Sequence, residues 1–74
     1  MSYGQRARHI VSELFELSER LKDAQREIIL GAAKLSMMPS EGTLRKISDL
    51  ENTIAAVDAL IQEEAEKRRQ ARVA

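Results

Sequence analysis

Apolar residues recur along the first half of the chain at alternating steps of three and four residues. The repeat runs through Ala7, Ile10, Leu14, Leu17, Leu21, Ala24, Ile28, Gly31 and Leu35. An α-helix has about 3.6 residues per turn, so this spacing places all of these side chains on one face. The pattern predicts a long helix over about residues 2–36 whose apolar face is directed at another helix.

The second half of the chain has a similar but shorter repeat. It runs through Ile47, Leu50, Ile54, Val57 and Ile61, and then falls on Glu64 and Arg68. We therefore expect a second helix over about residues 41–72, whose last turns have no apolar face. No alternating polar and apolar run predicts a strand.

A break separates the two helices at residues 37–40. Pro39 lacks an amide hydrogen and disfavours a helical conformation for Met38. Ser40 is a good N-cap for the second helix, and Glu41 suits its positive N-terminal end. Two long helices joined by so short a break predict an all-α fold, an antiparallel two-helix hairpin that forms a single domain over residues 1–74.

Folding the chain back at residues 39–40 predicts which residues face each other. Leu35 falls opposite Leu44, and Leu21 falls opposite Val57. Ala24 falls opposite Ala55, where two small side chains would let the helices approach closely. We expect the core of the hairpin, and of a dimer built from it, to contain Leu17, Leu21, Ile28, Leu35, Leu44, Ile47, Leu50, Ile54, Val57 and Ile61.

The pairing fails near the start of the chain. Ile10, Val11, Leu14 and Phe15, called the N-terminal stripe below, fall opposite Ala65 and the basic residues that follow it. The apolar arcs of both helices are also wider than one seam can cover, which predicts a homodimer, either a four-helix bundle or a coiled-coil-like assembly. The stripe then has two possible roles. It packs on Met37, Met38 and Leu44 of a second, antiparallel copy, or it stays open and binds another protein.

Met37 and Met38 themselves have two possible roles. We expect them to form the core of the loop, and the alternative is that they make adaptable contacts with a partner.

Charged residues suggest a further candidate site only at the ends of the chain. Charged residues make up 32% of the chain, and the formal net charge is zero. The hairpin brings the basic residues of both termini to one end, called the basic tip: Arg6, Arg8, Lys67, Arg68, Arg69 and Arg72. Three roles are open for the basic tip: a solvated end that complements the helix dipole, a site for an acidic protein, and a site for nucleic-acid phosphates.

Candidate chemistry is sparse. The chain has no cysteine, and His9 is its only histidine. Glu16, Glu19, Asp23 and Glu27 lie along one side of the first helix, but a di-metal bundle site also needs Glu-x-x-His motifs, which the chain lacks. We therefore predict a solvated acidic face, no catalytic residues, no metal site and no cofactor, and so a protein that is not an enzyme.

The pattern predicts a function in binding. No segment approaches the roughly 18 apolar residues of a membrane span, and the start of the chain has no apolar signal segment, so we expect a cytoplasmic protein with no membrane partner. The leading hypothesis is a small dimeric regulatory protein, of the antiactivator, inhibitor or adaptor type. It would bind a larger protein through the N-terminal stripe and the basic tip, and inhibit or sequester it. The alternatives are a hairpin that binds RNA or DNA through the basic tip, and a structural coiled-coil assembly element.

Overall fold

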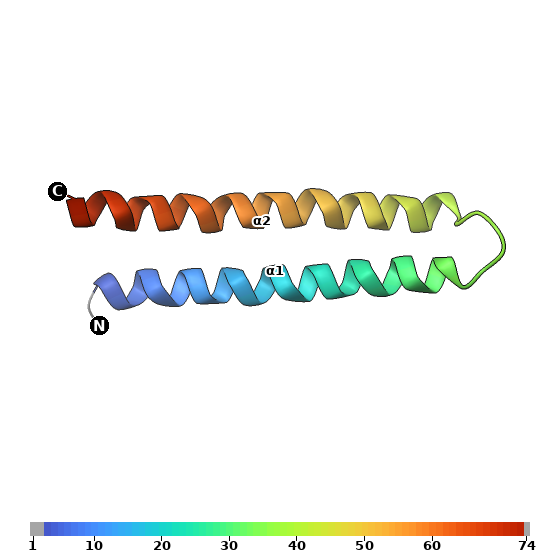
Figure 1. The fold of residues 1–74 in the computed structure, drawn as a ribbon, viewed down its shortest axis with the longest axis horizontal. Coiled ribbons are helices and arrows are strands. Elements are labelled where there is room, and N and C mark those ends of the chain that lie inside the picture. Colours follow the sequence, from blue (N-terminus) through green and yellow to red (C-terminus); the bar gives the residue numbers. More distant parts are fainter. Residues whose placement is uncertain (1–2, 74) are drawn as a thin grey trace.

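The chain forms a helical hairpin in a computed structural model, which describes the backbone of residues 3–73 and the side chains of residues 10–71. Helix α1 spans Tyr3–Ala33 and helix α2 spans Glu41–Val73. The two helices lie side by side and antiparallel, and they give a rod of 56 × 20 × 15 Å (Figure 1). The expected all-helical hairpin is confirmed, and no strand occurs in the part of the chain that the structure describes.

Helix α1 ends at Ala33, a few residues earlier than expected. Its last turn tightens, because the Lys34 amide donates to the Gly31 carbonyl at 3.3 Å and the Leu35 amide donates to the Ala32 carbonyl at 3.1 Å. Both bonds span three residues instead of four, which is a common way for a helix to end. Leu35 therefore lies outside the helix and is 64% exposed, so it does not pack in the core as predicted.

Helix α2 begins at the predicted cap. The Thr43 amide donates to the Ser40 hydroxyl oxygen at 3.2 Å, and the Ser40 hydroxyl donates to Oγ1 of Thr43 at 3.0 Å. The Ser40 carbonyl accepts the first bond of the helix from the Leu44 amide at 3.0 Å. Ser40 is therefore the N-cap, because it satisfies an amide that the helix itself cannot.

The helices meet along one seam. The least exposed residues of α1, apart from Leu17, are Val11, Leu14, Ser18, Leu21, Gln25, Ile28 and Ala32. They face a matching row of α2, which is Thr43, Ile47, Leu50, Ile54, Val57, Ile61 and Glu64. Both rows keep the alternating steps of three and four that a pair of packed helices requires.

The seam of α1 is turned relative to the prediction. Ile10, Ala24 and Gly31 were expected on the seam, but all three are exposed. Ser18 and Gln25 lie there instead, because they form hydrogen bonds to α2 that apolar residues cannot form. The predicted close approach of Ala24 and Ala55 is consequently wrong, since both side chains are exposed.

The core is thin. Among the predicted core residues only Ile54 and Val57 are buried. The half-buried ones are Leu17, Leu21, Ile28, Ile47, Leu50 and Ile61. Leu35 and Leu44 are exposed. A single hairpin thus leaves part of almost every core side chain in contact with water.

Replacing Ser40 with alanine removes the cap of α2. We expect the free energy of unfolding to fall by about 1 kcal/mol, because the Thr43 amide loses its side-chain acceptor. Chemical denaturation at a fixed protein concentration measures the change. Ser36→Ala is the matched control, since Ser36 is exposed in the loop, and it should change stability by less than about 0.5 kcal/mol. An equal effect of the two substitutions would contradict the role of Ser40.

Candidate interaction surface

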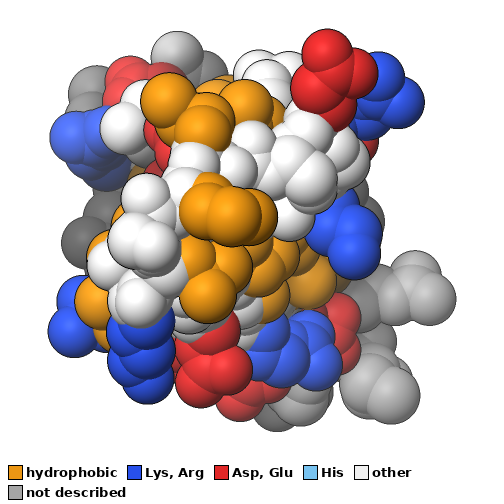
Figure 2. All heavy atoms as spheres, turned by 90° about the vertical axis from the view of Figure 1, so that its right-hand side faces the viewer, with side chains coloured by type: hydrophobic (Ala, Val, Ile, Leu, Met, Phe, Trp, Pro, Cys, Tyr) orange, Lys and Arg blue, Asp and Glu red, His pale blue; other side chains and the backbone are white. Residues whose placement is uncertain are grey.

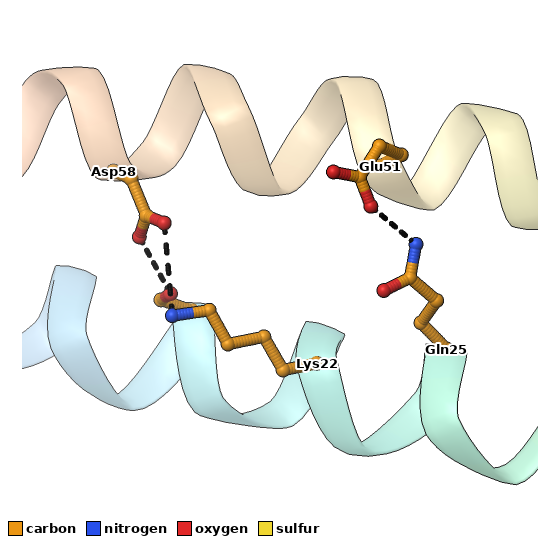
Figure 3. A network of polar contacts seen from close by, with 5 residues as sticks. Lys22, Gln25, Glu51 and Asp58 are labelled. Atoms are coloured by element: carbon orange, nitrogen blue, oxygen red, sulfur yellow. Dashed lines mark hydrogen bonds and ion pairs between the residues drawn. The ribbon is translucent and has the colours of Figure 1, made fainter.

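One side of the seam is held by polar side chains, centred on Ser18 and Asp58. Ser18 is only 2% exposed, and its hydroxyl donates to Oδ1 of Asp58 at 2.8 Å. Nζ of Lys22 lies 3.6 Å from the other carboxylate oxygen of Asp58 (Figure 3). Asp58 therefore bridges two successive turns of α1. The ion pair is half exposed and adds little by itself, whereas the buried hydroxyl requires its partner.

A second polar contact lies two turns further along α1. Nε2 of Gln25 donates to Oε2 of Glu51 at 2.7 Å and approaches the Ile47 carbonyl at 3.4 Å (Figure 3). We call Ser18, Lys22, Gln25, Glu51 and Asp58 the polar flank. The sequence reasoning assigned no role to these residues. A signal was nevertheless present, because Val11, Ser18, Gln25 and Ala32 repeat every seven residues beside Leu14, Leu21 and Ile28.

The opposite side of the seam is apolar and largely exposed in the single chain, with only Leu17 half-buried. Leu17 and Ala24 each precede a polar-flank residue of α1, so they lie about 100° around the helix from it. This side, called the open flank, consists of Ile10, Leu17, Ala24 and Gly31 of α1 and Leu60 of α2. Ile10 and Leu60 are exposed, and a Cβ atom at Gly31 would meet no atom within 4 Å. The open flank is therefore a surface on which another helix could lie closely.

The loop end of the hairpin carries a second apolar area. Leu35, Met37, Met38 and Leu44, called the loop-end patch, are all exposed, with Met37 at 74% and Met38 at 83%. Viewed from this end, apolar side chains occupy the middle of the surface and charged side chains surround them (Figure 2). The expectation that the two methionines form the core of the loop is wrong, because α1 ends too early to cover them.

The N-terminal stripe does not form one continuous patch. Val11 and Leu14 are half-buried on the seam, where α2 covers them because it continues to Val73. Ile10 is exposed on the open flank, and Phe15 is 54% exposed. Phe15 follows Ile10 by five positions, which is about 140° around the helix, so these two side chains point in different directions.

The described part of the basic tip is largely paired within α2. Nζ of Lys67 lies 3.8 Å from a Glu63 oxygen and 3.5 Å from a Glu64 oxygen. The Arg69 guanidinium donates to Oε2 of Glu66 at 2.6 Å. Arg68 is exposed. Arg6, Arg8 and Arg72 lie outside the residues whose side chains are described. These acidic partners reduce the positive field that a phosphate backbone would meet.

The described residues hold no cluster typical of a reactive centre. Among them no three His, Cys, Asp or Glu side chains lie close enough together to hold a metal ion. Over the same residues, neither helix combines the length and the apolar character that crossing a membrane requires. His9 is outside the described side chains. The features that stand out are the exposed apolar areas.

Comparisons with protein-family models, with curated proteins and with solved structures gave no match to this chain. Function must therefore be inferred from the surfaces themselves.

A double-mutant cycle on Ser18 and Asp58 tests the polar flank. Ser18→Ala alone should lower the free energy of unfolding by about 1 kcal/mol, because it removes a buried hydrogen bond. In a chain that already carries Asp58→Ala, Ser18→Ala should lower the free energy of unfolding much less. Denaturation experiments should therefore give a coupling energy between Ser18 and Asp58 of about 0.5–1.5 kcal/mol. Lys22→Ala, at the exposed side of Asp58, should cost less than about 1 kcal/mol. Independent effects of Ser18 and Asp58 would show that this contact does not stabilise the hairpin.

Proposed function

We propose that this protein is a regulatory interaction module. A homodimer of hairpins binds a larger protein and inhibits or sequesters it. Binding uses apolar side chains at the ends of the hairpin, with Phe15 near the N-terminal end and Met37 and Met38 at the loop end. Arg68, in the half of the rod that also carries Phe15, supplies a positive charge for an acidic group of the partner.

The amount of exposed apolar surface on a small rod supports this proposal most directly. Among the described side chains, nine large apolar ones are exposed: Ile10, Phe15, Ile29, Leu30, Leu35, Met37, Met38, Leu44 and Leu60. Single exposed apolar residues are normal, but contiguous groups rimmed by charge are typical of protein interaction sites. Exposed methionines also adapt their shape to a partner at little cost. A binding role accounts for these side chains, whereas catalysis would not require them.

A substitution at Phe15 tests the proposal. In a pull-down from a lysate of the source organism, wild-type protein should retain a discrete partner that Phe15→Glu loses. A Phe side chain buried in an interface contributes about 2–3 kcal/mol, so its loss should weaken binding roughly 30- to 150-fold. Met38→Glu tests the loop-end patch in the same way. Ser12→Glu is the matched control, because it adds the same charge at an exposed position of α1 without removing an apolar group.

Three outcomes would contradict the proposal. Recovery of the same partner by wild type, Phe15→Glu and Met38→Glu would show that neither apolar area is the site. Recovery of no protein except this chain would favour a structural assembly element. Tight, salt-dependent binding of duplex DNA or structured RNA at about 50 mM salt would favour a nucleic-acid-binding function, because phosphate contacts are strongest at low salt. Circular dichroism should show that each variant remains helical.

A further inference from the structure

We propose that the open flank is the homodimer interface, on which helix α1 of one copy packs antiparallel against α1 of a second copy. This inference rests on the dimer in the proposed function and specifies its geometry. It assigns a partner to Ile10, Ala24 and Gly31, which are exposed in the single hairpin, and completes the cover of the half-buried Leu17. The occupant of the open flank is thus a second copy of this chain.

The first argument is the repeat along α1. Two seven-residue repeats share Leu14, Leu21 and Ile28. The hairpin uses the repeat that adds Val11, Ser18, Gln25 and Ala32. The other repeat adds Ile10, Leu17, Ala24 and Gly31, and it is apolar throughout. Helices with an apolar repeat on each of two adjacent faces contact two neighbours, as the helices of a four-helix bundle do.

The second argument is the size of the side chains. In an antiparallel pair, the two positions of the repeat alternate in each layer; Leu35, which falls opposite Ile10 in this register, lies beyond the end of α1 and outside the helical layers. Ile28 then falls beside Leu17, and Leu21 falls beside Ala24. Leu14 falls beside Gly31, where a Cβ atom would find open space within the single chain. The layers that pair Leu21 with Ala24 and Leu14 with Gly31 each set a large side chain against a small one, so the side chains can interdigitate without gaps.

The third argument is the order of charges beside the open flank. Glu13, Arg20, Glu27 and Lys34 recur every seven residues next to the apolar repeat and alternate in sign. All four are exposed, and none forms an ion pair with the described residues of its own chain. Antiparallel packing places Arg20 near Glu27 of the second copy, and Glu13 near Lys34, which directly follows the last residue of α1. Parallel packing would place these four positions of the two copies on opposite sides of the interface, where they could not pair with one another.

These charges explain why a second copy fits better than an unrelated helix. A two-fold dimer requires a surface that is complementary to itself, with residue i facing residue j and residue j facing residue i. Each of the four charges finds its opposite under the same antiparallel register that pairs the apolar layers. Exposed ion pairs contribute little affinity, so their role is to select the orientation, while the apolar layers supply the association energy.

Charge reversal tests the register through self-association. Arg20→Glu brings two acidic side chains together at both copies of this contact in the dimer, and Glu27→Arg brings two basic side chains together there. Sedimentation velocity should show that each single reversal weakens self-association by about tenfold or more. An equimolar mixture of the two variants should recover dimers of near wild-type affinity, because both contacts of a mixed dimer join an acidic side chain of one variant to a basic side chain of the other.

A double variant tests the same register within one chain. Arg20→Glu combined with Glu27→Arg exchanges the two charges, so both contacts of its dimer again join opposite charges under the antiparallel register. Sedimentation velocity should therefore show that the double variant self-associates with near wild-type affinity.

Controls separate this register from general charge effects. Arg26→Glu makes the same charge change on an exposed face of α1 away from the open flank, so it should leave the dimer intact. Failure of the double variant to recover dimers would overturn the antiparallel register, and unchanged dimers in both single variants would place the interface elsewhere. A wild-type chain that sediments as a monomer would overturn the interface altogether.

Failure of this inference and failure of the proposed function are distinguishable. The reversals at Arg20 and Glu27 alter the oligomeric state, whereas Phe15 lies on the other side of the seam and Phe15→Glu alters capture of the larger protein. If Phe15→Glu abolishes capture of the larger protein while charge reversal leaves self-association unchanged, the proposed function stands and this interface is wrong.

Discussion

A pair of helices can bury only the strip of surface along which the two helices touch. This constraint governs the whole molecule, because each helix here carries a wider apolar arc than one strip can cover. The consequence is a core in which, of the described side chains, only Ile54 and Val57 are buried apolar residues, while large side chains remain in water on both sides and at the loop end. Small chains compensate for such a core with disulfides, metals or association. This chain has no cysteine, and the described residues form no metal cluster; the support that we propose is association.

Polar residues decide which apolar face stays uncovered. Ser18 and Gln25 of α1 reach Asp58 and Glu51 of α2, and these contacts fix the rotation of α1 about its axis. A more apolar arrangement was available, with Leu17 and Ala24 turned toward α2. It would have left Ser18 and Gln25 without their partners. It would also have packed the repeat that contains Leu17 and Ala24 against α2. With this rotation Ile10, Ala24 and Leu60 stay exposed, and they belong to the surface that we propose for a second copy.

The sequence predicted the hairpin, the break and the start of α2 well, because these features depend on local chemistry. Pro39 and Ser40 act on their immediate neighbours, and the apolar repeat of α2 allows only one interpretation. The rotation of α1 was not predictable in the same way, since two repeats share Leu14, Leu21 and Ile28. Choosing between them needs knowledge of which α2 side chains lie across the seam. The early end of α1 also depends on hydrogen bonds of its last turn, and it changed the environment of Leu35, Met37 and Met38.

The exposure of the N-terminal stripe could not be predicted from the pattern of one helix alone. Its four residues are neighbours in the sequence pattern, but α2 extends far enough to cover Val11 and Leu14, and Ile10 and Phe15 are left on different sides. The basic tip changed for a similar reason. Lys67 and Arg69 are spaced so that acids of their own helix reach them, which a count of basic residues does not reveal. In both cases the neighbouring turns decided what the surface offers.

Sedimentation equilibrium at low micromolar concentration tests the central claim most directly. An 8.3 kDa chain that cannot cover its own apolar surface should sediment at about twice that mass, and its unfolding midpoint should rise with protein concentration. A single-chain mass combined with cooperative unfolding that does not depend on concentration would contradict the claim, because it would show that the lone hairpin is stable without a partner.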